Sequence, residues 1–338
     1  MKKKFNSGLL IFIIVIAVTL ALASIAIISK TKFNSDSNKS ITISVPLGNT
    51  QNIKVKKASS KSKEYIAHLK IEGQISSDIT PYYNHQWLVS TIKKLKNDNN
   101  NLAIALYIDS PGGGVYESDE IYTTLQDYKT SGKKVYVYMG PMAASGGYYI
   151  SCAADAIYAN RNTLTGSIGV ICGQSIDCTE LFENLGIKYE IVHSGKNKNM
   201  GNINEPLSDE QRSILQSISD ECYEQFLSIV VSKRKLSYPE ARKLCDGRIF
   251  TAMQALNNGL IDKIDSWDNM LYDLCNEIER EDCSLKEFKY EYKPNVFEYL
   301  TSICGNISNK QAAAKIGIPE KLLNEINNPS MEPQYLYR

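Results

Sequence analysis

A single serine stands at a junction whose residue types would suit nucleophilic chemistry. In "VYVYMGPMAASGGYYISCAADAIYAN", an apolar strand pattern runs into Gly-Pro, and an alanine-rich helix pattern follows Ser145. The positive end of a helix dipole at that point would favour an oxyanion. The small residues from Ala143 to Gly147 would let a substrate chain approach closely. The serine could instead cap the helix, and the local pattern fits both interpretations.

A second glycine-rich junction lies upstream, in "YIDSPGGGVYES". Gly112, Gly113 and Gly114 stand between a strand pattern and a helix start, where glycine permits positive φ and leaves backbone N–H groups uncovered. Aimed at one point, such N–H groups form an anion cradle or an oxyanion hole. The segment lacks the G-K-[ST] ending of a phosphate-binding P-loop. A simple loop remains the alternative to an oxyanion hole.

A serine hydroxyl needs a base before it attacks a carbonyl at neutral pH. His68, His85 and His193 do not stand in patterns typical of a catalytic histidine, so a Ser-His-Asp triad is not favoured. A neutral lysine could serve if burial lowers the pKa of its amine. Lys196 and Lys198, in "HSGKNKNMGN", follow a strand pattern. Lysines in polar loops are usually solvated, so the spacing alone selects neither.

The elements that must position these residues alternate between strand and helix. "YIAHLKIEGQI", "NLAIALYIDS" and "KKVYVYMG" have strand patterns, and "NHQWLVSTIKKLKND" and "VYESDEIYTTLQDYKTSG" have helical spacing. Such alternation from about residue 63 to residue 280 predicts one α/β domain of repeated β/α units around a largely parallel sheet. A long helix should begin near Asp209 and Glu210, whose carboxylates suit a first turn.

The amino terminus predicts a membrane anchor. "MKKKFNSG" is basic, and the next 21 residues carry no charge. A helix of that length rises roughly 30 Å, enough to cross a bilayer. Lysines at the start should stay in the cytoplasm and send the remainder outward. A cleaved signal peptide is the alternative, because "ALA" resembles a processing site, but the apolar run continues to Ile28.

The chain therefore divides into five predicted parts. They are a cytoplasmic basic start (1–8), a transmembrane signal anchor (9–29), a polar tether with a brief strand at "SITISV" (30–62), the α/β domain (63–280), and a C-terminal helical extension and tail (281–338).

Charge and cysteine content exclude several classes of protein. The net charge is +1, from 38 basic and 37 acidic residues, which argues against a nucleic-acid partner. The eight cysteines include no C-x-x-C pair, so neither a zinc site nor any other metal site is expected. We expect these cysteines to be buried free thiols that pack as small apolar groups.

Four motifs follow one another in the order seen in a known family. "YIDSPGGGV", "GPMAASGGYYISCAADAIYAN", "TLTGSIGVI" and "SGKNKNMGN" resemble the signal peptide peptidase family, the SppA-type membrane serine proteases. "GRIFTAMQALNNGLID", residues 247–262, is similar to a later signature of that family. The resemblance spans about residues 64–275. It implies that residues 63–280 form a protease domain with a ClpP/crotonase-like fold, preceded by one transmembrane helix.

The resemblance implies a Ser-Lys dyad. Ser145 matches the family's nucleophile, and the "G-x-x-K-[DN]" element makes Lys198 the general base, with Lys196 as the alternative in a shifted register. Ser167 in "TGSIGV" matches a hydroxyl that orients the lysine amine, although it could simply be a turn serine. Asn199 departs from the acidic residue that is commoner after the lysine.

Two backbone N–H groups complete the implied site. Those of Gly113 and Gly146 would form the oxyanion hole, with Gly114 as the alternative to Gly113. A further departure from the family pattern is Ala252, where glycine is usual. Neither this alanine nor Asn199 touches the proposed proton transfer, and the mechanism needs no cofactor, metal or nucleotide.

The implied activity is hydrolysis of apolar peptides, such as remnant signal peptides, at the extracytoplasmic face of the cell membrane. In longer two-repeat members the serine and lysine come from different repeats. A single-repeat chain is therefore expected to form a ring-like homo-oligomer, with Ser145 of one protomer facing Lys198 of the next, and the short members suggest an octamer. The tail "MEPQYLYR" could lie in a neighbour's substrate groove or could be disordered.

Three rivals remain. A related Ser-Lys protease could act on other membrane or cell-envelope proteins. A crotonase-like acyl-CoA enzyme also uses glycine-rich oxyanion loops, but an outward location argues against cytosolic acyl-CoA. An inactive scaffold would not need the serine, the glycines and the lysine together.

Overall fold

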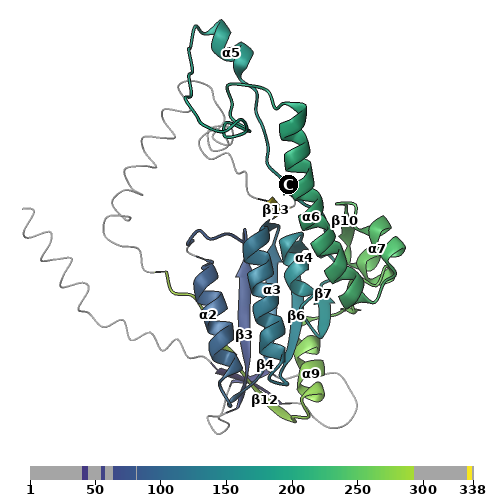
Figure 1. Cartoon of the computed structure of the whole chain (residues 1–338). Helices are drawn as coiled ribbons and strands as arrows, with labels where there is room; N and C mark the ends of the chain where they lie inside the picture. Colours follow the sequence, from purple (N-terminus) through teal and green to yellow (C-terminus); the bar gives the residue numbers. More distant parts are fainter. Residues whose placement is uncertain (1–39, 45–54, 58–63, 81, 293–332, 337–338) are drawn as a thin grey trace, which may run out of the picture. The chain divides into compact units, whose positions relative to one another are not determined.

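Parallel strands form the centre of a ten-stranded sheet in the described part of the chain (Figure 1). The computed structural model describes residues 40–44, 55–57, 64–80, 82–292 and 333–336, so the predicted anchor at 9–29 lies outside the described residues. The strands that pair in parallel at the centre are β3 (Tyr65–Glu72), β4 (Asn101–Ser110), β6 (Lys134–Ala144), β7 (Ala156–Ala159) and β8 (Leu164–Gly166). Their nearly continuous apolar sequences are typical of strands that are buried on both faces.

Side chains of β4 alternate between the two faces of the sheet, as the pleat requires. Ile104, Leu106 and Ile108 pack in one core with side chains of α2 (His85–Lys96) and α3 (Val115–Lys129). Ala103 and Ala105 point to the opposite face, where they pack with the apolar side of α9 (Trp267–Glu277). Helices therefore cover both faces, as β/α alternation predicts.

Two short elements follow the central strands at the same edge of the sheet. Strand β5 (Gly112–Gly114) follows β4 and leads directly into α3, and helix α4 (Gly146–Ser151) follows β6. Since β4 and β6 are parallel, both glycine-rich junctions lie at the carboxyl ends of neighbouring strands. This edge is the place where ligands commonly bind in parallel sheets.

The second half of the domain begins with the long helix α6 (Asp209–Arg234). Ser208 and Gln211 form a capping box at its start, and Phe226, Leu227 and Val230 are buried against the core. Before α6 come β9 (Ile171–Cys172) and α5 (Thr179–Asn184), and after it come α7 (Tyr238–Leu244), β10 (Ile249–Thr251), α8 (Ala252–Asn257) and β11 (Lys263–Ile264).

Segments far apart in the sequence complete the other edge of the sheet. Strand β12 (Asp282–Glu287) pairs in parallel with β3 and antiparallel with β1 (Ser40–Ser44). Strand β1 also pairs with β2 (Val55–Lys57). Strands from the predicted tether and from beyond residue 280 thus extend the same sheet.

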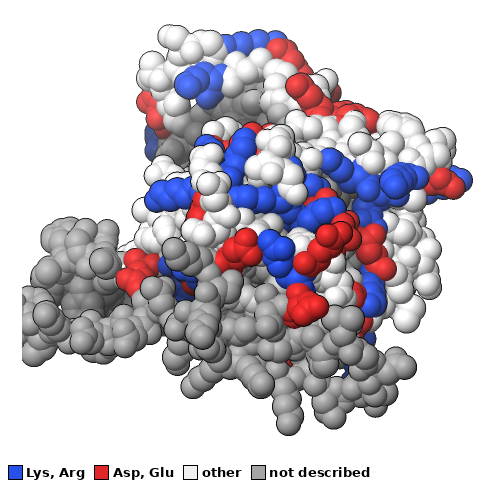
Figure 2. Space-filling view, turned by 90° about the horizontal axis from the view of Figure 1, so that it is seen from below, with Lys and Arg blue, Asp and Glu red and all other residues white. Residues whose placement is uncertain are grey.

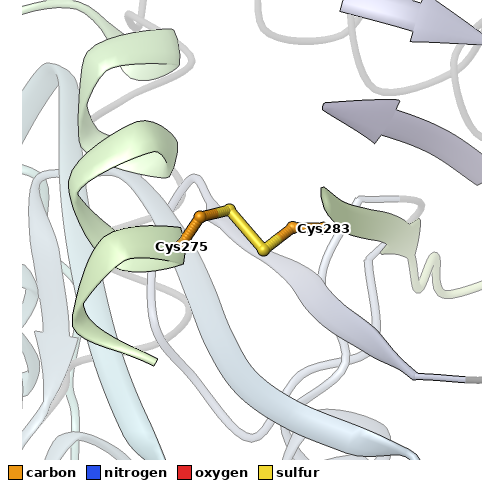
Figure 3. The surroundings of a disulfide bond; sticks show 2 residues. All are labelled: Cys275 and Cys283. Carbon is orange, nitrogen blue, oxygen red and sulfur yellow. A yellow bond between two sulfur atoms is a disulfide. The ribbon is translucent and has the colours of Figure 1, made fainter. Parts of the chain in front are cut away.

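One disulfide joins α9 to β12. Cys275 and Cys283 are bonded, with Cα atoms 6.3 Å apart, a normal separation for a disulfide (Figure 3). The expectation of free thiols is therefore wrong for this pair, because the end of α9 packs directly beside the strand. Cys152 and Cys245 are buried and free, as expected, whereas Cys172, Cys178 and Cys222 are only partly buried. Cys304 lies outside the described residues.

Charged side chains of both signs share the face shown in Figure 2. Pairs such as Lys96 with Asp127 and Lys134 with Glu277 leave basic and acidic groups side by side. Among the described helices, none is long and apolar enough to cross a bilayer. The same residues contain no group of three His, Cys, Asp or Glu side chains arranged to hold a metal ion.

Candidate active site

Ser145 lies where three strands meet. It follows β6, whose Ala143 pairs with Ser110 of β4 and whose Ala144 pairs with Gly166 of β8. The Ser145 N–H donates to the carbonyl of Gly166 at 2.7 Å. The backbone of the serine is thus fixed by neighbours on both sides.

The conformation of Ser145 is strained. Its φ of 53° and ψ of −115° fall in a region that is nearly confined to glycine. Such a conformation costs about 1–3 kcal/mol and occurs mostly at functional sites. Ser145 is the N-cap residue of α4, but its side chain makes no capping hydrogen bond. Its Oγ is buried and has no hydrogen-bond partner among the described residues, so helix capping does not explain this hydroxyl.

Gly113 and Gly146 lie where an added side chain would meet close neighbours. A Cβ on Gly113 would come 1.7 Å from the carbonyl oxygen of Ile75, and a Cβ on Gly146 would come 2.4 Å from Ser118 Oγ. The latter point is also 3.2 Å from the Gly113 nitrogen, so the two glycine turns are in direct contact.

The backbone N–H groups of Gly113, Gly114 and Gly146 differ in their hydrogen bonds within the protein. The Gly114 N–H donates to the Ile75 carbonyl at 2.8 Å, which favours Gly113 over Gly114 as an oxyanion donor. Gly146 is the first residue of α4, and its N–H has no acceptor within the helix. Gly113 and Gly146 can therefore present two N–H groups beside the Ser145 hydroxyl.

Ser167 lies beside Ser145, immediately after Gly166. It is buried, has a φ of 49°, and its N–H donates to the carbonyl of Arg248 at 2.7 Å. It also lines a cleft of about 570 Å³ whose wall includes Asp220 and Asp246. The structure thus brings Ser145, Ser167 and both glycine turns together.

Lys198 is not brought to them within one protomer. It lies in the segment 173–208, here called the arm, which connects β9 to α6 and contains α5 (Figure 1). Its side chain is exposed and makes no ion pair or hydrogen bond with the described residues. Lys196, the alternative base, is ion-paired with Glu210 in the first turn of α6, and this contact lowers the pKa of the Glu210 carboxyl.

The arm has little core of its own. All of its residues are described, and Asn199 is the only one that is buried. The Asn199 amide donates to Glu205 Oε1 at 2.7 Å and so holds the turn that presents Lys198. The asparagine that departs from the family pattern therefore has a structural role in this chain.

The histidines have partners away from Ser145. His85 Nε2 lies 2.6 Å from the Glu120 carboxylate. The ring of His68 packs 4.6 Å from that of Trp267, and burial lowers its pKa to about 4. His193 is exposed on the arm. Their positions agree with the expectation that histidine is not the base.

A strand from the C-terminal tail lies along the site. Strand β13 (Pro333–Leu336) pairs antiparallel with β5 on one side and with β9 on the other. Its register places Tyr335 opposite Gly113. The tail, expected to lie in a neighbour's groove or to be disordered, thus pairs at Pro333–Leu336 with β5 and β9 of its own chain, beside Gly113.

The sequence did not identify Ile75 and Ser118 as parts of this site. Ile75 donates to Gly112 and accepts from Gly114, so it clamps the glycine turn from another loop. Ser118 is fully buried against Gly146. A serine one turn after the glycines, within "GGGVYES", was the only available signal for Ser118.

The fold and the site together define a class of protein. A serine at the end of a parallel strand, beside two glycine turns that carry backbone N–H groups, is an arrangement suited to acyl transfer. The profile of the Clp protease family matches residues 67–179, in agreement with a ClpP-like mixed α/β fold. The structure of a ClpP1 mutant from Listeria monocytogenes aligns with a TM-score of 0.41 and 17% identity, over 60% of this chain and 94% of that chain.

Sequence relatives give a narrower assignment. The profile of peptidase family S49 matches residues 127–279. A protein named as signal peptide peptidase SppA in Enterococcus faecium is 31% identical, over 75% of this chain and 74% of that protein. A protein named as a protease in Synechocystis sp. is 37% identical, over 60% of this chain and 70% of that protein. Protease 4 of Haemophilus influenzae is 32% identical, over 80% of this chain and 46% of that protein. The chain belongs to peptidase family S49 and is a serine protease of the SppA and protease 4 type.

Proposed function

We propose that this protein is a membrane-anchored endopeptidase that uses a Ser145–Lys198 dyad to hydrolyse apolar peptides, such as remnant signal peptides. The observation that carries the proposal is the state of Ser145: a strained backbone and a buried hydroxyl without a partner among the described residues, beside two glycine turns. The names of the Enterococcus and Haemophilus relatives support the peptidase class. The uncharged N-terminal segment supports an anchor that leaves the protease domain outside the cytoplasm.

The reaction proceeds through an acyl-enzyme. Neutral Lys198 removes the proton from Ser145 Oγ, which attacks the peptide carbonyl. The N–H groups of Gly113 and Gly146 stabilise the oxyanion, each worth on the order of 3 kcal/mol. Lys198 then protonates the leaving amine, and water hydrolyses the ester. Ser167 accepts a hydrogen bond from the lysine amine and so directs its lone pair at Ser145.

The dyad is assembled between protomers. An exposed ammonium is a poor base at neutral pH, so Lys198 must enter a buried site to become neutral. Large apolar side chains are exposed along the arm that carries it, as expected for a surface that docks onto another copy. They are Leu181, Leu185, Ile187, Tyr189 and Val192.

The substrate binds as an added strand. Strand β13 already pairs with β5 and β9, which supports a groove in which any extended peptide could form the same main-chain bonds. Hydrogen bonds to the peptide backbone do not depend on side chains, so peptides of many sequences can form them. Such recognition suits an enzyme that degrades varied apolar segments.

The experiment compares single variants and their mixtures on a fluorogenic apolar peptide, with the full chain in detergent or vesicles. Ser145→Ala and Lys198→Ala should each be inactive, whereas Lys196→Ala should be active. If the two inactive variants are dissociated and reassembled together, activity should return, because some interfaces pair an intact serine with an intact lysine. Normal turnover by Lys198→Ala would reject this base, and no recovery in mixed oligomers would reject a shared dyad.

A further inference from the structure

A second buried hydroxyl without a partner lies next to the nucleophile. Ser118, in the first turns of α3, has no exposed surface, and its Oγ has no hydrogen-bond partner among the described residues. A buried polar group in this state costs about 1–3 kcal/mol. Buried hydroxyls normally have a hydrogen-bond partner. Ser151, which is equally buried in the neighbouring helix α4, has one, because its Oγ donates to the Gly147 carbonyl at 2.8 Å.

The position of Ser118 Oγ connects it with the oxyanion donors. It is the atom nearest to the point that a side chain on Gly146 would occupy, at 2.4 Å. The Gly113 nitrogen lies 3.2 Å from the same point. The unused hydroxyl therefore lies against Gly146, close to the place where the two glycine turns meet.

We propose that the Ser118 hydroxyl is a third hydrogen-bond donor of the oxyanion site. This inference rests on the proposed function. In the free enzyme the hydroxyl has no acceptor among the described residues, and the tetrahedral intermediate supplies one when the carbonyl oxygen becomes negative. A serine hydroxyl rotates freely about its C–O bond, so it can aim its proton without moving the backbone. A donor satisfied only in the transition state raises the rate rather than the affinity for substrate.

The variant Ser118→Ala removes this donor and leaves the dyad and both N–H groups in place. We expect kcat to fall by about 10- to 100-fold, less than the full effect of a principal oxyanion donor, with KM nearly unchanged. A peptide aldehyde, which forms a hemiacetal oxyanion on the serine, should bind more weakly by a similar factor. The amide of the same peptide, which forms no oxyanion, should bind equally well to both enzymes.

Ser151→Ala is the matched control. It also deletes a buried serine hydroxyl near the site, but one that already has a partner. It should lower the thermal unfolding midpoint and leave kcat and the aldehyde-to-amide ratio unchanged. Ser118→Ala should not lower that midpoint, because the lost hydroxyl makes no bond to the described residues of the free enzyme.

Two kinds of failure can be told apart. If the wild-type protein shows no Ser145-dependent hydrolysis, the proposed function is wrong. If hydrolysis depends on Ser145 but Ser118→Ala retains normal kcat and a normal aldehyde-to-amide ratio, only the role of Ser118 is rejected. An equal loss of aldehyde and amide binding would also reject it, since that result reports a packing defect.

Discussion

The surroundings of Ser145 and the arm that carries Lys198 differ in burial, in backbone conformation and in how closely their residues are packed. The serine is buried, its backbone is held in a strained conformation, and closely packed glycines lie beside it. The arm exposes its lysine and most of its apolar side chains, and its helix α5 has no buried residue. One part of the proposed dyad is organised by the protomer alone, and the other part requires a surface that the protomer does not provide.

Replacing the nucleophile with glycine should separate activity from stability. Ser145→Gly removes the hydroxyl and also relieves the unfavourable φ and ψ. We expect activity to fall by on the order of 10⁴-fold or more and the free energy of unfolding to rise by about 1 kcal/mol. Peptide hydrolysis and urea denaturation measure the two effects. A less stable Ser145→Gly protein would show that the backbone there is not strained.

Adjacent glycines should tolerate alanine very differently. A Cβ on Gly113 meets the backbone carbonyl of Ile75, which cannot move without opening the turn, whereas a Cβ on Gly114 meets the flexible side chain of Glu117. Gly113→Ala should reduce kcat by about 10²- to 10³-fold, as loss of one oxyanion donor does. Gly114→Ala is the control and should keep most of the wild-type activity, because it shifts only a side chain. Equal losses would contradict the assignment of Gly113 as the oxyanion donor, and a larger loss in Gly114→Ala would mean that the two N–H groups have exchanged roles.

Acidic pH should lower the stability of the sheet, through His68 in β3, rather than that of the arm. Burial lowers the pKa of His68 to about 4, below the ordinary value of 6.5, and Glu287, Lys70 and Lys289 face the ring. The unfolded chain therefore binds the proton more readily, so the free energy of unfolding should decrease as the pH falls from about 6.5 to 4. Denaturation at several pH values should show a loss of about 3 kcal/mol from this residue. His68→Leu should make the free energy of unfolding depend less steeply on pH. An unchanged slope would show that His68 is not the source of this dependence.

The smallest expected effect concerns the strand that already occupies the groove. A chain that ends at residue 332 lacks β13, so substrate would no longer compete with the tail for β5 and β9. We expect KM to fall about threefold with kcat unchanged, since competition reduces only the accessible fraction of sites. Tyr335→Pro in the full chain should give the same result, because proline removes a strand N–H. An unchanged KM in both would show that the tail does not compete.

The sequence predicted the central strands and the place of Ser145 at a strand-to-helix junction because each depends on local patterns. Continuous apolar runs define β4 and β6, and small residues mark the strand-to-helix junction. The pairing of β12 with β1 depends on a register between distant segments, which no local pattern specifies. The strain at Ser145 and the contact of Ser118 with Gly146 likewise arise only when separate loops pack together.

The position of β12 between β3 and β1 sets an order of events during synthesis. Strand β3 emerges from the ribosome long before its partner Asp282–Glu287. Until then, one edge of the growing sheet has unpaired N–H and C=O groups, and such an edge invites pairing with other chains. The bond between Cys275 and Cys283 can form only at the same late moment. In an oxidising compartment it would lock β12 covalently to α9 once this edge is covered, so a nascent chain released before β12 is made would be open to aggregation along β3.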